Sequence, residues 1–301
     1  DGSCTHTSMQ LAIEVATLSI TSVFFVLRAR QQQQKKENQM IDPGFSNKRR
    51  EPTEKYWSQK PTLQFIHELP KVELHAHIGG SIRDETLAEL ISNSASTSSS
   101  SYPELQVLQG DQRSLSDCFQ LFDAVHDLVN SLSILKRITK ETIEDFAREN
   151  CVYLELRTTP RYDIPNVTAR QYVDTVLEAI QECQKEEKTK NIVVRLLLSV
   201  SRAHDSTYGM NTVDLAGNSN RDIVVGLDFS GNPTKGNIND FLPVFERART
   251  LYQLPITFHV GEINDSIEVN IILKNLHSND RLGHALYLTN EQKEMLLNKN
   301  R

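Results

Sequence analysis

The 301-residue chain has few cysteines, no marked excess of charge of one sign, and no long uninterrupted apolar run. Its four cysteines form no C-x-x-C pair and no spacing typical of a disulfide framework, which favours free thiols in a reducing compartment, and we expect the cytosol. The net charge of −6 argues against a nucleic-acid polymer as partner. It does not exclude a small anionic ligand, because a site can be locally basic in an acidic protein.

The most apolar segment is residues 11–27. It contains Glu14, and its uninterrupted part is shorter than the roughly 20 residues that a membrane span requires. Basic residues follow it, as they would on the cytoplasmic flank of an anchor. We nevertheless expect an unstructured leader here, followed by a polar linker that contains the glutamine run 31–34. We therefore predict that residues 1–56 are disordered and that residues 57–301 form the folded domain.

From Pro70 onward, short runs rich in β-branched residues alternate with longer amphipathic segments. Apolar residues recur three and four positions apart in residues 115–129, 138–149 and 170–184, which predicts helices, and the polar residues 92–101 predict a flexible surface loop. Alternation of strands and helices indicates a parallel sheet covered on both faces, which fits a doubly wound sheet and a barrel equally. The predicted strands are 72–77, 152–158, 192–200, 223–229, 255–259 and 281–284.

The strongest motif is H-A-H, His75 to His77, at the end of the first predicted strand. Alternate residues of a strand point to the same side, so the two imidazoles lie roughly 6.6 Å apart along the chain. At that spacing they can converge on one metal ion. Two core histidines, or one ligand with one supporting neighbour, are the alternatives.

A second motif, H-V-G-E at residues 259–262, follows a later strand. Gly261 allows a sharp turn that can bring Glu262 over the group that His259 holds. A carboxylate in that place can take a proton from water and pass it to a ring nitrogen. The alternative is an ordinary helix N-terminus with a glutamate in its first turn.

A third motif, G-H-A at residues 283–285, follows the last predicted strand. His284 can steer and polarise an attacking water, or it can be an ordinary loop histidine. All three motifs lie at the C-terminal ends of predicted strands, where α/β barrels place their chemistry. The three together are therefore more specific than any one of them.

These motifs resemble those of the adenosine deaminase family. The sequence L-P-K-V-E-L-H-A-H at 69–77 is similar to the opening motif of that family. Two further stretches, Y-L-E-L-R-T-T-P-R at 153–161 and G-L-D-F-S-G-N-P at 226–233, resemble the adenosine deaminase-like branch, which hydrolyses N6-methyl-AMP to IMP and methylamine. The resemblance covers residues 62–301. It implies a monomeric (β/α)8 barrel with a single zinc ion and a purine nucleotide as substrate.

The resemblance also implies roles for the three motifs. His75, His77 and His259 become the zinc ligands, and zinc makes hydroxide available at neutral pH for attack on C6 of the purine. Glu262 becomes the proton donor to N1, and His284 assists the water. The other zinc deaminase class uses a P-C-x-x-C motif, which this chain does not contain.

Substrate contacts follow from the same resemblance. Arg161 supplies a planar cation suited to a phosphate, although on its own it could be a plain surface arginine. Gly231 would meet the purine edge through its backbone. The positions that match the substrate contacts of the branch are His77, His126, Thr158, Thr159, Pro160, Arg161 and Gly231.

The match departs from the branch at Gly79, Ser201 and Asn232, where Asn, an acidic residue and Asp are usual. The family also takes its last zinc ligand from an Asp on an eighth strand, followed by a second Asp, and no Asp-Asp pair follows Glu262 here. We therefore expect an incomplete barrel of about six βα units, and little or no deaminase activity from this polypeptide as it stands. Adenosine deaminase proper and a non-catalytic isoform are the alternatives.

Overall fold

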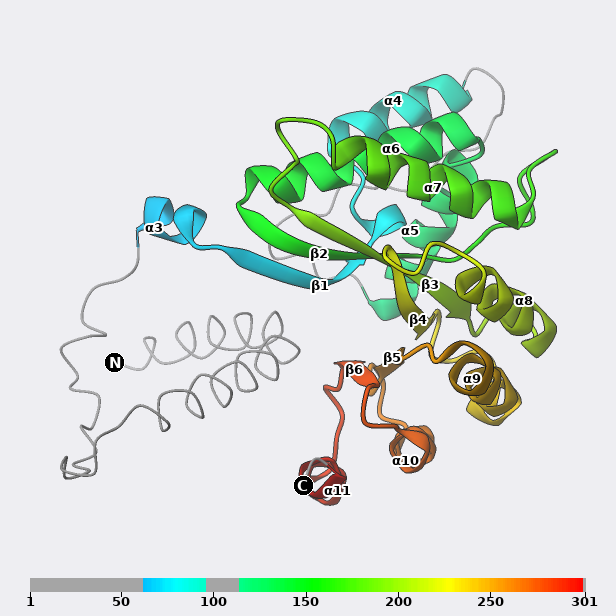
Figure 1. Cartoon of the computed structure of the whole chain (residues 1–301). Coiled ribbons are helices and arrows are strands. Elements are labelled where there is room, and N and C mark those ends of the chain that lie inside the picture. The colour runs from blue at the N-terminus through cyan, green and yellow to red at the C-terminus, as the bar shows by residue number, and fades with distance from the viewer. Residues whose placement is uncertain (1–61, 96–113, 300–301) are drawn as a thin grey trace, which may run out of the picture. The chain divides into compact units, whose positions relative to one another are not determined.

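The computed structural model describes residues 62–95 and 114–299 (Figure 1). The chain divides between Pro70 and Lys71 into two compact units. In the first, a short helix, α3 (Leu63–Glu68), begins where Thr62 Oγ1 accepts a hydrogen bond from the amide of Phe65. The predicted leader and linker lie outside the described residues. Among the helices of the described ranges, none is both long enough and apolar enough to cross a bilayer.

The second unit is built on a six-stranded parallel sheet in which each strand pairs with the next one along the chain (Figure 1). A doubly wound sheet reverses its strand order at a switch point, and this sheet does not. Its order is that of consecutive strands in a TIM-type barrel, which confirms the predicted incomplete barrel. The strands are β1 (Lys71–His77), β2 (Cys151–Thr158), β3 (Val193–Ser201), β4 (Val224–Ser230), β5 (Ile256–Val260) and β6 (Arg281–His284).

Helices follow the strands and cover the outer face of the sheet (Figure 1). Four buried phenylalanines of β4, β5 and α9 pack against one another, with neighbouring ring centroids 5.0 to 6.3 Å apart. The helical elements of the second unit are η2 (Ile78–Gly80), α4 (Asp84–Ala95), α5 (Leu115–Leu128), α6 (Leu132–Arg148), α7 (Ala169–Cys183), α8 (Ser206–Gly217), α9 (Ile238–Tyr252), α10 (Ser266–Asn275) and α11 (Asn290–Lys299).

Two sequence-based boundaries were wrong. The helix predicted over 138–149 begins at Leu132, because Ser131 Oγ accepts a hydrogen bond from the amide of Ile134 and caps the helix six residues earlier. The loop predicted over 92–101 is helical as far as Ala95, since α4 continues past its last apolar residue. Residues 96–101 lie outside the described ranges.

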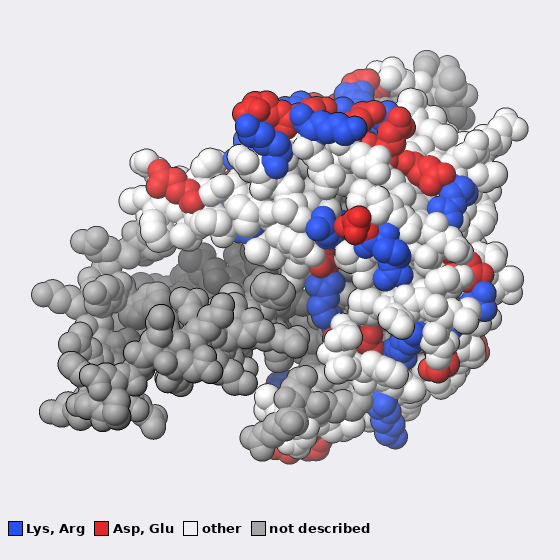
Figure 2. All heavy atoms as spheres, viewed as in Figure 1, with Lys and Arg blue, Asp and Glu red and all other residues white. Residues whose placement is uncertain are grey.

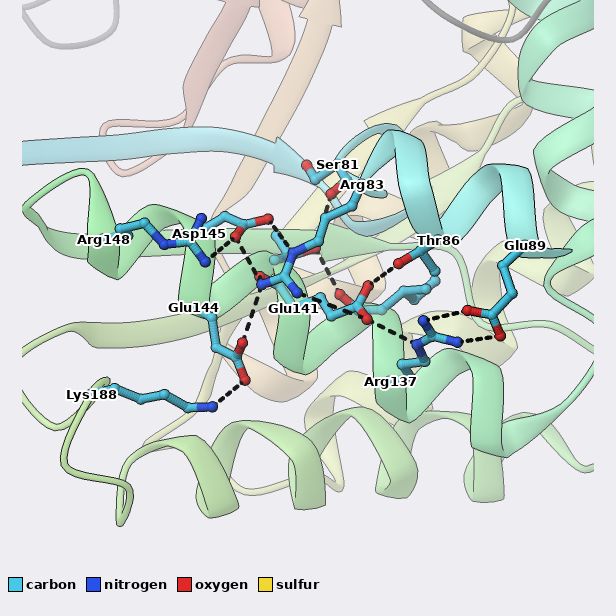
Figure 3. A network of polar contacts seen from close by, with 12 residues as sticks. Ser81, Arg83, Thr86, Glu89, Arg137, Glu141, Glu144, Asp145, Arg148 and Lys188 are labelled. Atoms are coloured by element: carbon cyan, nitrogen blue, oxygen red, sulfur yellow. Dashed lines mark hydrogen bonds and ion pairs between the residues drawn. The ribbon is translucent and has the colours of Figure 1, made fainter.

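Charged side chains form a dense network on the outer surface of α4, α6 and α7 (Figures 2 and 3). Arg83, just after η2, makes two hydrogen bonds of 2.8 Å to the carboxylate of Asp145 and one of 3.1 Å to Glu144. These bonds tie the segment that follows β1 to α6. Exposed ion pairs stabilise a protein little. The Arg83 side chain is only 27% exposed and contacts Asp145 through two nitrogens, so this pair should stabilise the fold more.

We expect Arg83→Met to lower the free energy of unfolding by about 1–2 kcal/mol, because it removes the two-pronged contact with Asp145. Arg148→Met is the matched control, since Arg148 contacts the same carboxylate at 3.1 Å but is 67% exposed, and its loss should cost under about 0.5 kcal/mol. Urea unfolding of both variants measures the difference. Equal effects would mean that Arg83 contributes no more than a surface charge.

Candidate metal and catalytic site

Three histidines converge at the C-terminal edge of the sheet. Nε2 of His259 in β5 lies 2.8 Å from Nε2 of His75 and 3.0 Å from Nε2 of His77, both in β1. β1 and β5 are separated by three strands in the sheet order, so only the curvature of a barrel brings these side chains together. Each neutral imidazole offers one lone pair to a metal ion. His259 belongs to both groups whose ligand atoms all lie within 4.8 Å of one another, one with His75 and His284 and one with His77 and Asp228.

An irregularity in β1 helps to aim its two histidines. The register of β1 against β2 shifts between Glu73 and Ala76, and the amide of His75 donates to Glu73 Oε1 at 2.6 Å. Such bulges occur next to active sites because they redirect side chains. Leu74 and Ala76 are buried, and the alternation of the strand puts His75 and His77 on the other face, where they meet His259.

Three imidazoles of the site, those of His75, His77 and His284, stay uncharged at neutral pH. Burial lowers the pKa of His77 to about 3, against the opposing charge of Asp228. Burial also lowers the pKa of His284 to about 4, and burial with the charge of Arg157 brings the pKa of His75 well below its usual range. The neutral form is the one that binds a metal ion, so these histidines are ready to act as ligands.

A buried ion pair between Arg157 and Asp228 lies next to Nδ1 of His259. Asp228 of β4 lies with one carboxylate oxygen 3.1 Å from Nδ1 of His259 and 2.6 Å from a guanidinium nitrogen of Arg157 in β2. Ser199 Oγ donates to the other oxygen at 2.9 Å, and Arg157 also donates to the carbonyl of Leu74. Although burial alone would raise it, the charges of His259 and Arg157 hold the pKa of Asp228 well below its usual range.

Both oxygens of Asp228 therefore already have partners, although Asp228 lies close enough to His77 and His259 to belong to a metal-binding group. We assign Asp228 to orienting His259: a proton held on Nδ1 leaves the lone pair on Nε2, which faces the other histidines. Neither Arg157 nor Asp228 has a role in the sequence-based prediction. The signal available for Asp228 was a single charged residue within the apolar run of β4, whereas β2 contains two charged residues, Glu155 and Arg157.

Glu262 and His284 lie beside the histidine cluster. Glu262 Oε2 is 3.8 Å from His284 Nε2, and the ring centroid of His284 is 4.9 Å from that of His75. Gly261 has a φ of 66°, so the turn that the sequence indicates is present. His284 itself has a φ of 60°, a strained conformation for a residue with a side chain. Burial raises the pKa of Glu262, which favours a carboxyl that carries a proton.

Gly283 makes room for the cluster. A Cβ atom at this position would lie 3.0 Å from Cε1 of His75, closer than side chains normally approach. The glycine of the G-H-A motif thus lets β6 pass directly beside a histidine of β1.

Most of the positions that match substrate contacts lie at or just after the ends of β1, β2 and β4. His77 is part of the histidine cluster, and Gly231, with a φ of 108°, follows the end of β4. Thr158 ends β2, where its hydroxyl is 2.8 Å from that of Tyr172, and the carbonyl of Pro160 accepts from Tyr208. Thr159, between them, is partly buried.

Arg161 and His126 meet around one carboxylate. Arg161 donates to both oxygens of Asp163 at 2.9 and 2.7 Å, and Nε2 of His126 lies 3.0 Å from the same group. Arg161 also donates to the carbonyls of His126 and Val129 at 2.6 Å each. The guanidinium is therefore held in a fixed orientation, and its charge is shared with Asp163, whose pKa falls well below the usual range because of the bond to Arg161.

Comparison with known proteins agrees with this geometry. A family model described as Adenosine deaminase matches residues 70–299. The N6-mAMP deaminase of Arabidopsis thaliana is 39% identical over 251 residues, which cover 76% of the chain and 70% of that protein. The N6-Methyl-AMP deaminase of Homo sapiens is 38% identical over 231 residues, which cover 74% of the chain and 63% of that protein.

Solved structures match as well. The crystal structure of Arabidopsis ADAL complexed with GMP has a TM-score of 0.70 at 40% sequence identity, and the match covers 78% of the chain and 70% of that structure. The IMP complex of the same protein matches at a TM-score of 0.70 and 39% identity, over the same shares of both chains. The chain thus spans between 63% and 70% of the length of these relatives.

Proposed function

Because this chain belongs to the adenosine deaminase family, we propose that its three histidines hold a zinc ion for the hydrolytic deamination of a purine nucleotide. The proposed substrate is N6-methyl-AMP, with IMP and methylamine as products. One observation carries the proposal: Nε2 of His259 lies 2.8 Å from Nε2 of His75 and 3.0 Å from Nε2 of His77, with Glu262 and His284 beside them. Relatives named N6-methyl-AMP deaminase support the choice of substrate.

The donor set suits zinc, which prefers imidazole nitrogens and takes three protein ligands in catalytic sites. A bound zinc ion supplies a Lewis acid that activates water at neutral pH. The carboxylate of Asp228, 3.1 Å from Nδ1 of His259, is proposed to favour a proton on Nδ1, so that Nε2 stays available as a ligand. His284, uncharged at neutral pH, can hydrogen-bond the attacking water and hold it toward C6 of the purine.

Glu262 moves the proton. Its carboxyl is partly buried and its pKa is raised, so it can hold a proton and donate it to N1 of the purine. Protonation at N1 lets the ring accept the electron pair that arrives when C6 is attacked. The neighbouring His284 lies 3.8 Å from the carboxylate, so the water and the proton carrier share one face of the site.

The remaining contacts would hold the nucleotide. We propose that the backbone at Gly231 meets the purine edge and that Thr158 to Pro160 line the approach to it. Arg161 and the half-exposed His126 are proposed to bind the phosphate, with Asp163 keeping both side chains in place. Asp163 and two backbone carbonyls already accept from Nε, Nη1 and Nη2 of Arg161, so the phosphate would meet the second N–H of Nη2 together with His126.

Metal content and substrate choice test the proposal. The full chain, purified with zinc, is expected to bind about one ion per chain by mass spectrometry. Among N6-methyl-AMP, AMP and adenosine, N6-methyl-AMP should be the preferred substrate. Preference for adenosine would replace the nucleotide assignment, and a chain without zinc would contradict the proposal as a whole.

A substitution of Arg161 tests whether the site binds a nucleotide or a nucleoside. We expect Arg161→Gln to weaken the binding of IMP by about tenfold or more, since a charge-assisted hydrogen bond contributes about 1.5–3 kcal/mol. Inosine, which has no phosphate, should bind with unchanged affinity. Calorimetric titration of both ligands measures this, and an equal loss for both would show that Arg161 acts through the loop it braces.

A further inference from the structure

Arg202, the residue after β3, is a buried cation at the C-terminal edge of the sheet. Its side chain is 3% exposed. A guanidinium buried to this degree needs partners for its charge and its N–H groups. Those partners come from separate segments of the chain: β4, the loop after it, and the first turn of α10.

The contacts are short and directional. One Nη atom donates to Glu268 Oε1 at 2.6 Å, in the first turn of α10. The other donates to the carbonyl of Pro233 at 3.1 Å, in the loop after β4. The guanidinium carbon also lies 4.9 Å from the ring centroid of Phe229 in β4, within the range of a cation–π contact.

The loop after β4 is packed tightly around the same residue. A Cβ atom at Gly236 would lie 2.5 Å from the carbonyl oxygen of Arg202, and one at Gly231 would lie 3.1 Å from its Cγ. Both glycines have positive φ, 68° and 108°. The amide of Arg202 also donates to the carbonyl of Ser230 at 2.9 Å. Backbone and side chain of Arg202 together therefore determine the path of residues 231–236.

On the other side, Glu268 anchors the start of α10. Asp265 caps this helix by accepting from the amides of Ile267 and Glu268 at 3.1 and 3.0 Å. Fixing Glu268 therefore fixes the first turn of α10, and the loop from β5 to that turn carries Glu262. The pKa of Glu262 responds as well: burial raises it, and the charges of His259 and then Arg202 oppose the rise.

We propose that Arg202 is a positioning residue that joins the loops after β3, β4 and β5 and thereby fixes Gly231 and Glu262 relative to the three histidines. The roles of Gly231 and Glu262 in this inference rest on the proposed function, whereas the link between the loops rests only on the contacts of Arg202. The contacts of Arg202 within the described residues are with these segments and not with the histidine cluster, so we assign its effect on the site to the loops.

Hydrogen exchange tests the joining of the loops without any need for turnover. In the full chain loaded with zinc, Arg202→Met should speed the amide exchange of segments 231–236 and 262–268 by about tenfold, while zinc content stays unchanged. The affinity for IMP should fall by a similar factor. Arg202→Lys retains a charge for Glu268 but not the forked geometry, so it should protect segment 262–268 better than segment 231–236.

Arg249→Met is the matched control. Arg249 forms a comparably buried pair with Asp280 at 2.6 Å, just before β6 and at the opposite edge of the sheet. It should lower overall stability without changing either segment selectively. Should Arg202→Met fail to fold, Glu268→Gln breaks one link only and should speed exchange in segment 262–268.

Two results would overturn the proposal. One is the same amide-exchange pattern in Arg202→Met and Arg249→Met, and the other is faster exchange in Arg202→Met that is confined to the loop after β3. Failure of the unaltered chain to bind zinc or IMP would contradict the proposed function instead. The exchange pattern would still decide the role of Arg202, because it depends on neither ligand chemistry nor catalysis.

Discussion

His259→Ala is expected to remove almost all zinc from the purified chain. His259 is the histidine that contacts both others, at 2.8 and 3.0 Å, and without it the two remaining ligands come from one strand. Structural zinc sites bind with about 10–16 kcal/mol in total, so the loss of one ligand should lower affinity by about 100-fold or more. Mass spectrometry of the metal content and competition with a chelator measure the effect.

The exposed His277 provides the control, because it lies before β6, away from the cluster. His277→Ala should keep its zinc. His284→Ala tests the ligand set itself: His284 lies near enough to His75 and His259 to form a metal-binding group, but we assign it to the water. Zinc loss in His284→Ala as complete as in His259→Ala would show that His284 is a ligand.

The second large effect is expected from Asp228→Asn. Arg157 and Asp228 are 1% and 0% exposed, and removing the carboxylate charge leaves a buried cation without compensation. We expect a loss of about 3–5 kcal/mol in the free energy of unfolding. Zinc affinity should fall by about 10–100-fold, since the group that orients His259 is altered. Asp222→Asn, at an exposed position before β4, is the control.

A double variant separates the two effects. Replacing a buried ion pair by apolar residues of similar size is often neutral or stabilising. Arg157→Met combined with Asp228→Leu should therefore recover most of the lost stability while zinc affinity stays low. Recovery of both would mean that Asp228 acts on zinc only through folding.

Much of the fold was predictable, because strand and helix patterns are local. All six predicted strands lie within about one residue of β1 to β6, and the H-A-H motif ends a strand as expected. The errors at the start of α6 and the end of α4 concern a cap and a polar last turn, which carry no apolar periodicity.

The supporting groups of the site were harder to foresee. Arg157 and Asp228 are 71 residues apart and meet only because β2, β3 and β4 pair in register. The same holds for Arg202 and Glu268, 66 residues apart. Local pattern shows that a charge lies in an apolar strand, but the partner that compensates it depends on the tertiary fold.

The distance along the chain between the ligands has a consequence for folding. His75 and His259 are 184 residues apart, so the pair closes a very long loop. An ion held by both would stabilise only conformations in which every intervening strand is already in place, and it would bind the unfolded chain far more weakly. Metal uptake during refolding should therefore be a late event that follows the formation of β2 to β4. Its rate would report how quickly the most distant contacts of the sheet are made.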